Sequence, residues 1–311
     1  MTLGNEKPGK VTILLSTYNG CRFLQQQLNS LYEQTYPDIR ILVRDDGSSD
    51  STRNILDSEQ AKGSIDILEG HNNLGPALSF FELLRSAASA GTEYVAFCDQ
   101  DDVWHPQKIA QAVSALNAAT GSAPAMYCSR AEIVDEHLKH IGYTEMPRKV
   151  GFGNALVENM AIGCTILLNR KAIDLIRENL PSKVLIHDWW CYLVISCFGE
   201  IVFDNSTNIK YRQHGANTIG VATNKFDRFK RKMRRFFDGG NGRQWISAQA
   251  SSMRDIFKDN IPPSKRQVLN SFIEMKFSLY RRLRLFLSKD VWRQKWSDNL
   301  LLRMLILLNR F

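Results

Sequence analysis

Short apolar runs alternate with amphipathic helical patterns along the first 120 residues of the chain. Apolar and β-branched residues predict strands over 11–17, 39–46, 64–70 and 93–99. Between these strands, apolar residues recur three and four positions apart, which is the spacing of one helical face. Strands that alternate with helices in this way favour a mostly parallel sheet with helices on both faces. The sequence therefore predicts an α/β fold.

The pattern becomes less regular after residue 120. Three strands and one apolar helix are predicted over 125–135, 164–170, 199–205 and 189–198, respectively. We expect mixed strand pairing in this part. From Val221 the composition shifts to Lys, Arg and aromatic residues with helical periodicity. These changes divide the chain into the segments 1–120, 121–220 and 221–311.

Clusters of polar residues follow the four predicted strands of the first segment. They read STYNG, DDGSSD, NNLG and DQDD, over 16–20, 45–50, 72–75 and 99–102. Right-handed crossovers place the carboxyl ends of parallel strands along one edge of the sheet, where ligands bind. The sequence therefore predicts one crevice that is lined by all four clusters.

Three carboxylates lie within four positions, at Asp99, Asp101 and Asp102. Like charges this close repel one another, and burial would add a further cost. Mg²⁺ and Mn²⁺ prefer carboxylate and water oxygens and are usually bound together with substrate phosphates. The motif therefore indicates either a cation that bridges a diphosphate to the protein or a solvated acidic turn.

The charge of the chain is unevenly distributed. The 311 residues carry a formal net charge of +8, but residues 221–311 hold 21 Lys and Arg against 7 Asp and Glu. The first 220 residues hold 19 basic and 25 acidic residues. A basic region that mixes cations with aromatic residues, such as 225–237, is typical of contact with an anionic membrane. A solvated helical cap is the alternative, and nucleic-acid binding is not expected because no recognition motif is found.

The cysteines and the apolar runs indicate the cellular compartment of the protein. None of the six cysteines forms a CxxC pair, and no run reaches the roughly 18–20 apolar residues of a membrane span. The first apolar run, VTILL, is too short for the core of a secretory signal. We therefore expect reduced thiols and a cytoplasmic location.

The order and spacing of the motifs resemble one known family. STYNG, DDGSSD, NNLG and DQDDVW, followed by HDWW (187–190) and YRQH (211–214), resemble family 2 of the inverting glycosyltransferases. The likeness spans about residues 11–215, and its later motifs resemble the bacterial rhamnosyltransferase type. It implies a GT-A (Rossmann-like) mixed sheet flanked by helices, with a basic C-terminal helical extension. Residues 1–120 would then be the nucleotide-sugar-binding half, and 121–220 the acceptor-binding half, of one domain.

The resemblance implies a site for the donor nucleotide. Its members would be Thr17, Tyr18, Asp45, Asp46, Asn73, Gly75 and Asp99. Thr17 and Tyr18 would contact the nucleoside, and one of the two acids after the second strand would accept a hydrogen bond from the pyrimidine imide or the ribose. Tight turns and helix caps account for the same residue types at 45–50 and 72–75, and both interpretations can hold together.

The resemblance also implies a metal site for Mg²⁺ or Mn²⁺. Asp101 would be the principal ligand, Asp99 would face the ribose or the metal, and His214 would complete the shell or pair with the diphosphate. Arg212 is an alternative partner for the phosphates. Asp102 would orient its neighbours or cap the next helix.

HDWW supplies the expected general base. Asp188 would take the proton from the attacking hydroxyl on the face opposite the leaving diphosphate. A plain helix cap is the alternative for this residue. His187 would orient Asp188 or bind sugar, while Trp189 and Trp190 would stack on a sugar face or pack in the core.

Together these features predict a metal-dependent inverting glycosyltransferase. The expected donor is dTDP-L-rhamnose, with a UDP-hexose as the alternative. The expected acceptor is a hydroxyl of a lipid-linked glycan in O-antigen or other bacterial surface polysaccharide synthesis. The enzyme would be peripheral at the inner face of the membrane. Two other classes are a sugar nucleotidyltransferase, which would need a basic Gly-rich loop that STYNG lacks, and a non-catalytic membrane-associated scaffold.

Overall fold

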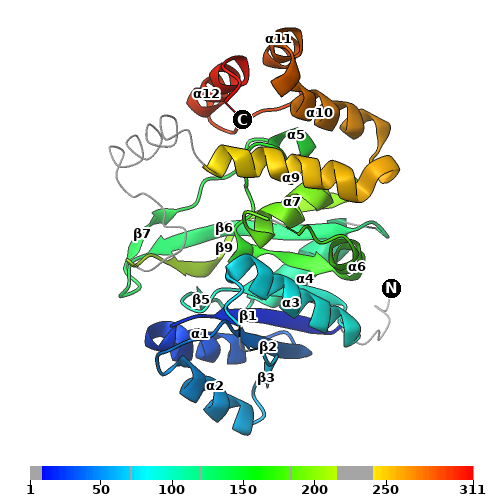
Figure 1. The fold of residues 1–311 in the computed structure, drawn as a ribbon. Helices are drawn as coiled ribbons and strands as arrows, with labels where there is room; N and C mark the ends of the chain where they lie inside the picture. The colour runs from blue at the N-terminus through cyan, green and yellow to red at the C-terminus, as the bar shows by residue number, and fades with distance from the viewer. Residues whose placement is uncertain (1–8, 71, 120, 183, 216–240, 311) are drawn as a thin grey trace.

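The computed structural model describes residues 9–70, 72–119, 121–182, 184–215 and 241–310, with side chains from 245 in the last range. A mixed sheet flanked by helices forms the centre of the molecule (Figure 1). The strands are β1 (Val11–Thr17), β2 (Ile39–Asp45), β3 (Asp66–Ile67), β4 (Tyr94–Cys98), β5 (Val103–Trp104), β6 (Ala125–Val134), β7 (His140–Tyr143), β8 (Leu167–Asn169) and β9 (Glu200–Arg212). The first helices are α1 (Cys21–Tyr32), α2 (Thr52–Ala61), α3 (Pro76–Ser89), α4 (Lys108–Ala119), α5 (Phe152–Ala155), α6 (Arg170–Glu178) and α7 (His187–Phe198), with the 3₁₀ turn η1 (Gly163–Thr165). The C-terminal helices are α9 (Asn241–Phe257), η2 (Lys258–Asn260), α10 (Pro263–Glu274), η3 (Met275–Phe277), α11 (Leu279–Leu287) and α12 (Trp296–Leu307).

The sheet is parallel in its first half and mixed in its second half. Its strand order is β3-β2-β1-β4-β8-β6-β9-β5, and β7 pairs with β6. The first four strands run parallel, β8 lies antiparallel between β4 and β6, and β9 runs parallel to β6. This arrangement confirms the predicted α/β class and the mixed pairing expected after residue 120.

Two apolar layers cover the two faces of the sheet. Within β1, Leu14 points into the layer formed with α3, α6 and α7, whereas Ile13 and Leu15 point into the layer formed with α1, α2 and α4. All three side chains are fully buried, because successive residues of a strand face opposite sides of a sheet covered on both. The strand ends are therefore the part of the sheet left open for polar chemistry.

Several predicted boundaries differ from the structure. Of the strand predicted over 64–70, only Asp66–Ile67 pairs with β2, and the strand predicted over 199–205 continues to Arg212. The helix expected from His105 begins at Lys108, and the strand β5 before it pairs with β9 through Val103 and Trp104. This pairing joins segments about 100 residues apart, which local patterns do not contain.

The C-terminal helices pack against the main body. α9 lies over α7, and α10, α11 and α12 follow at the end of the molecule farthest from β3 (Figure 1). The rings of Trp190 and Phe257 stack at 6.5 Å, and Phe198 contacts Phe257 at 4.7 Å. The basic stretch 225–237 lies outside the described residues. Among the described residues, no helix is long and apolar enough to cross a membrane.

Candidate active site at the strand ends

The ends of β1, β2 and β4 bring the first and last polar motifs together. Thr17 lies opposite Asp45 in the register of β1 and β2, and its hydroxyl donates a 2.8 Å hydrogen bond to that carboxylate. Gln100 bonds to the backbone of Tyr18 on both sides, accepting from its N–H at 2.9 Å and donating to its carbonyl at 3.0 Å. The Tyr18 ring is half exposed beside this junction, so it is accessible to a ligand.

Gly20 is required by this junction. A Cβ atom at this position would lie 2.1 Å from Oε1 of Gln100, the atom that accepts from Tyr18. Sequence reasoning did not single out Gln100 or Gly20. The only local signal for Gln100 was its place between two aspartates of DQDD.

The two acids after β2 are held by the protein itself. Asp45 accepts hydrogen bonds from Thr17 and from the N–H and hydroxyl of Ser48, at 3.0 and 2.6 Å. Asp46 accepts from the backbone N–H groups of Leu74 and Gly75, both at 2.8 Å. Both acids thus shape the donor-side loops, and the turn interpretation holds for each of them.

Arg44 is a buried cation that the sequence analysis missed. It pairs with Asp46, donates to Oγ of Ser79 at 3.1 Å, and donates to the carbonyl of Asn72 at 2.8 Å. This pair fixes the 72–75 loop, in which Gly75 takes a positive φ of 76° that favours glycine. The available signal was an arginine directly after the apolar run Ile41–Val43 and directly before the two acids.

The DQDD motif crowds its carboxylates at the end of β4. Ligand atoms of Asp99, Asp102 and Cys164 all lie within 4.8 Å of one another. Burial, together with Asp101 and Asp188, raises the pKa of Asp99, and burial with Asp101 and Asp99 raises the pKa of Asp102 well above its usual value. Oδ2 of Asp102 has no hydrogen-bond partner among the described residues. Such a carboxylate cluster fits a divalent cation, which would offset the repulsion.

Asp101 and His214 form the outer part of this cluster. Nε2 of His214 lies 2.7 Å from Oδ2 of Asp101, and the two side chains are 11% and 13% exposed. Asp102 and Cys164 are fully buried, and burial raises the pKa of the Cys164 thiol well above its usual value. A cation that also contacts a substrate diphosphate needs reachable oxygen and nitrogen ligands, so the geometry favours Asp99, Asp101 and His214 over the Cys164 set.

Arg212 holds the DQDD loop in place. Its backbone N–H donates to Oδ1 of Asp102 at 3.1 Å, and its Nε donates to the carbonyl of Asp101 at 2.6 Å. Its other two guanidinium nitrogens donate to the carbonyl of Glu136 at 2.6 Å and to Oε1 of Gln26 at 2.5 Å. Every guanidinium nitrogen thus bonds to the protein. These bonds use three of its five guanidinium N–H groups, so phosphate binding by Arg212 stays a prediction. Asp102 accepts from the backbone of Arg212, and the two roles expected of it also stay predictions.

Asp188 lies at the start of α7, buried and close to the acidic cluster. Its Oδ2 accepts from the N–H of Gly163 at 3.1 Å, and its Oδ1 accepts from the N–H of Trp189 at 2.6 Å. Burial raises the pKa of Asp188 to about 7. The N-cap of α7 is Ile186, and Asp188 lies in the first turn, where it accepts from one N–H and carries a carboxyl group whose pKa is near neutral. Its role as general base stays a prediction.

The three residues around Asp188 are held in the protein interior. His187 lies 4.0 Å from Phe80 and 4.8 Å from Phe97 between ring centroids, and burial lowers the pKa of His187 to about 3. Trp189 donates to the carbonyl of Ala155 at 2.6 Å and is almost fully buried. Trp190 is completely buried against Phe257. For Trp190 the structure favours core packing over stacking on a sugar face, because neither face of its ring is accessible.

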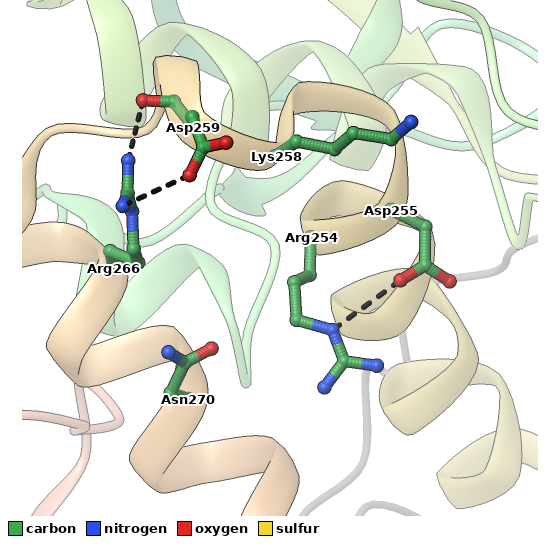
Figure 2. Close-up of a pocket in the computed structure, with 6 residues that line it drawn as sticks. All are labelled: Arg254, Asp255, Lys258, Asp259, Arg266 and Asn270. Atoms are coloured by element: carbon green, nitrogen blue, oxygen red, sulfur yellow. Dashed lines mark hydrogen bonds and ion pairs between the residues drawn. The ribbon is translucent and has the colours of Figure 1, made fainter.

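Two cavities lie outside this acidic cluster. One, of about 450 Å³, lies between the end of α9 and α10 (Figure 2). Its two arginines pair with its own acids, Arg254 with Asp255 and Arg266 with Asp259, each at 3.3 Å. The other, of about 230 Å³, borders the donor-side loop and is lined in part by Arg44 and Asn72. Only the second adjoins a sequence-predicted site.

The fold is shared with solved structures that contain a bound nucleotide sugar. One is TarS 1–349 of S. aureus in complex with UDP-GlcNAc, with a TM-score of 0.55 and 14% identity, covering 97% of this chain and 79% of that chain. Another is the mannosyltransferase PcManGT of Pyrobaculum calidifontis in complex with GDP-Man and Mn²⁺, with a TM-score of 0.52 and 17% identity, covering 89% and 72%. The structure therefore has the GT-A glycosyltransferase fold.

Sequence comparison then gives the family. Residues 12–175 match the family described as Glycosyl transferase family 2. The chain belongs to this family and is a glycosyltransferase. A protein of Shigella flexneri described as dTDP-rhamnosyl transferase RfbG is 26% identical over 309 residues, covering 96% of this chain and all of that protein. The Escherichia coli enzyme named UDP-Glc:alpha-D-GlcNAc-diphosphoundecaprenol beta-1,3-glucosyltransferase WfgD is 28% identical over 228 residues, covering 71% and 83%.

Proposed function

We propose that this glycosyltransferase moves L-rhamnose from dTDP-L-rhamnose to a hydroxyl of a lipid-linked glycan, with inversion at the anomeric carbon. A UDP-hexose is the alternative donor. One observation supports the reaction type: Oδ2 of Asp188 accepts from the N–H of Gly163, and Sγ of the next residue, Cys164, lies within 4.8 Å of ligand atoms of Asp99 and Asp102. The proposed base therefore lies beside the acidic cluster.

The donor nucleotide would lie along the ends of β1 and β2. Tyr18 offers an accessible ring, while Thr17, Asp45 and Asp46 hold the surrounding loops. Asn73 and Gly75 lie in the loop that Asp46 and Arg44 fix, where the side chain of Asn73 accepts from the N–H of Gly75 and Gly75 has a positive φ. These contacts support a nucleoside diphosphate as the class of leaving group, and the sugar has to be identified by measurement.

Asp99, Asp101 and His214 are the residues that would hold Mg²⁺ or Mn²⁺. Such a cation supplies positive charge where the leaving diphosphate develops negative charge. The protein's own contribution is to fix these groups: Arg212 holds the loop backbone at Asp101, and Asp102 accepts from Arg212.

Asp188 would act as the general base. A pKa of about 7 keeps an appreciable fraction of the carboxylate ionised at neutral pH, and the ionised form is the one that accepts a proton from the acceptor hydroxyl. Two backbone N–H groups and the N-terminal end of α7 keep the carboxylate oriented. Attack from this side, with the diphosphate leaving on the other, inverts the anomeric configuration.

The proposed setting is the inner face of a bacterial membrane, with the enzyme attached peripherally. The basic C-terminal region supports this setting through its charge of 21 Lys and Arg against 7 Asp and Glu. A lipid-linked acceptor is also supported by WfgD, whose name specifies a diphosphoundecaprenol-linked acceptor. A full-length relative described as a dTDP-rhamnosyl transferase supports the donor.

Thermal unfolding with dTDP and with UDP, each with and without Mn²⁺, tests the donor site without needing the acceptor. A ligand that binds only the folded state stabilises it by mass action, by about 2.7 kcal/mol at 100 times its Kd. We expect a rise in Tm that requires Mn²⁺ and is larger for dTDP. A larger rise with UDP would select the alternative donor, and no response to either nucleotide would contradict the enzymatic assignment of this site.

A further inference from the structure

Exposed apolar side chains gather on η3, α11 and α12. Phe277, Tyr280, Leu287 and Trp296 are each 72–77% exposed. In the described chain before η3, no large apolar side chain exceeds 53%, the value for Met146. We call the exposed apolar side chains of η3, α11 and α12 the apolar tip. A cluster of this kind marks an interaction surface, because soluble monomers rarely expose large contiguous apolar patches.

The apolar tip follows helical spacing and rests on a rigid support. Tyr280, Leu283 and Leu287 recur three and four residues apart on α11, while Leu285 faces inward and is buried. Arg303 of α12 donates to the carbonyls of Leu285 and Phe286, both at 2.8 Å, and to that of Val291 at 3.1 Å. The two helices are thereby joined, and they lie together at the end of the molecule opposite β3 (Figure 1). The apolar tip is therefore exposed although the helices that carry it are packed against each other.

Cations are interleaved with these apolar side chains. Residues 275–310 contain nine Lys and Arg against two Asp. Lys276, Arg281 and Arg284 are exposed beside Phe277, Tyr280 and Leu283. Helices that lie in a membrane interface combine an apolar face with flanking Lys and Arg in this way.

We propose that the apolar tip inserts into the headgroup region of an anionic lipid bilayer. This proposal deepens the proposed function by giving the membrane contact a location, separate from the basic stretch 225–237. A second copy of the chain is the other possible occupant, but a symmetric contact would bring nine cations against nine. Anionic lipid is complementary both to the charge and to the apolar side chains.

Vesicle flotation of the full chain tests the proposal. The test variant Leu287→Ser with Trp296→Ser removes two of the most exposed apolar side chains, and the control variant Ile141→Ser with Met146→Ser removes two exposed apolar side chains near β7. On vesicles containing phosphatidylglycerol, we expect the test variant to bind at least about tenfold more weakly than wild type, and the control variant to bind like wild type.

Three results would overturn the proposal. They are no flotation of the wild-type chain, equal flotation of both variants, and a wild-type dimer in light scattering that the test variant alone disrupts, which would assign the tip to a second copy. Both variants should retain nucleotide-dependent thermal stabilisation. Its loss in wild type would contradict the donor site while leaving the flotation result unaffected.

Discussion

Nε2 of His214 lies 2.7 Å from Oδ2 of Asp101, although the two residues are 113 positions apart. The contact joins the loop after β4 to the residues after β9, at the open side of the acidic cluster. Asp101 belongs to the DQDDVW motif and His214 to the YRQH motif, and both were expected to bind the same cation.

Replacing Asp101 by Asn should abolish the Mn²⁺-dependent part of the stabilisation by nucleotide. The amide removes a full negative charge from the group nearest His214, and a hard cation depends on such charge. His214→Ala should weaken the effect less, since the carboxylates remain. Thermal shifts with and without Mn²⁺ measure both variants. Asp57→Asn, an exposed acid of α2 that pairs with Arg53, is the matched control and should behave like wild type. An unchanged Mn²⁺ response in Asp101→Asn would remove this residue from the metal site.

Asp188→Asn should lower kcat by about 10²–10⁴, because the amide cannot take the proton of the acceptor hydroxyl. Nucleotide-dependent stabilisation should persist, since the proposed base acts on the acceptor and not on the nucleotide. Initial rates of sugar transfer, measured with the donor that stabilises the protein most, give the value. Asp174→Asn in α6, where the acid pairs with Arg170 and Arg177, should retain the wild-type rate. A variant with more than about a tenth of the wild-type kcat would assign the base to another group.

The same substitution should make the metal-free protein more stable at high pH. Burial raises the pKa of Asp188 from 3.8 to about 7, so between these values the folded state holds a proton that the unfolded state releases. The free energy of unfolding therefore falls as pH rises through this window. The variant Asp188→Asn has no carboxyl group that titrates at this position, so its free energy of unfolding does not fall for this reason. Urea unfolding in EDTA should show the variant gaining about 4 kcal/mol on wild type between pH 4 and pH 8, since the shift of about three units corresponds to about 1.4 kcal/mol per unit. Parallel pH profiles for the two proteins would contradict the shift.

Arg212→Lys should destabilise the protein by about 2–4 kcal/mol. The lysine cannot bond at once to the carbonyls of Asp101 and Glu136 and to Gln26, so buried acceptors lose their partners. Arg22→Lys is the matched control, because its pair with Glu136 is exposed and should contribute less than about 1 kcal/mol. Denaturant unfolding measures the free energy of unfolding of both variants. Equal losses would show that the Arg212 contacts stabilise the protein no more than the exposed pair of Arg22 does.

Gly20→Ala should weaken nucleotide binding by displacing Gln100. The added methyl group would lie 2.1 Å from Oε1, so the side chain that bonds to both backbone groups of Tyr18 must move. The backbone at Gly20 has φ −105°, which alanine adopts, so the effect is steric. Gly121→Ala, which has no atom within 4 Å of its Cβ, is the control. We expect about a tenfold rise in the Kd for the nucleotide in the first variant and no change in the second.

Much of the fold could be predicted because local patterns carry it. β1, β2 and β4 were placed within one residue at either end, since each is an apolar run that ends in a polar cluster. The meeting of Thr17 with Asp45 followed from parallel strand order alone. β5 and the second half of β9 could not be predicted in this way, because they form by pairing with each other across the sheet.

The sequence predicted which motifs form the site better than it predicted the hydrogen bonds that hold them in position. Arg44, Gln100 and Arg212 position the loops through hydrogen bonds to backbone groups that sequence periodicity does not show. Trp190 illustrates the same limit, because an aromatic residue beside a catalytic motif has the same pattern whether it faces a sugar or the core. Its burial is decided by α9, which begins about 50 residues later.

The pairing of β5 with β9 also sets the order in which the chain can fold. Trp104 pairs with Ile209, and this pairing follows directly after the acidic motif, so the loop that carries Asp99 and Asp101 closes only after residues 200–212 have left the ribosome. Contacts of such high sequence separation slow folding, because the chain entropy is lost before the contact forms. We expect the amide protons of Val103 and Trp104 to become protected in pulse-labelled hydrogen exchange later than those of β1 and β2. The first half of the sheet then acts as a template on which the catalytic loop is the last part to become ordered.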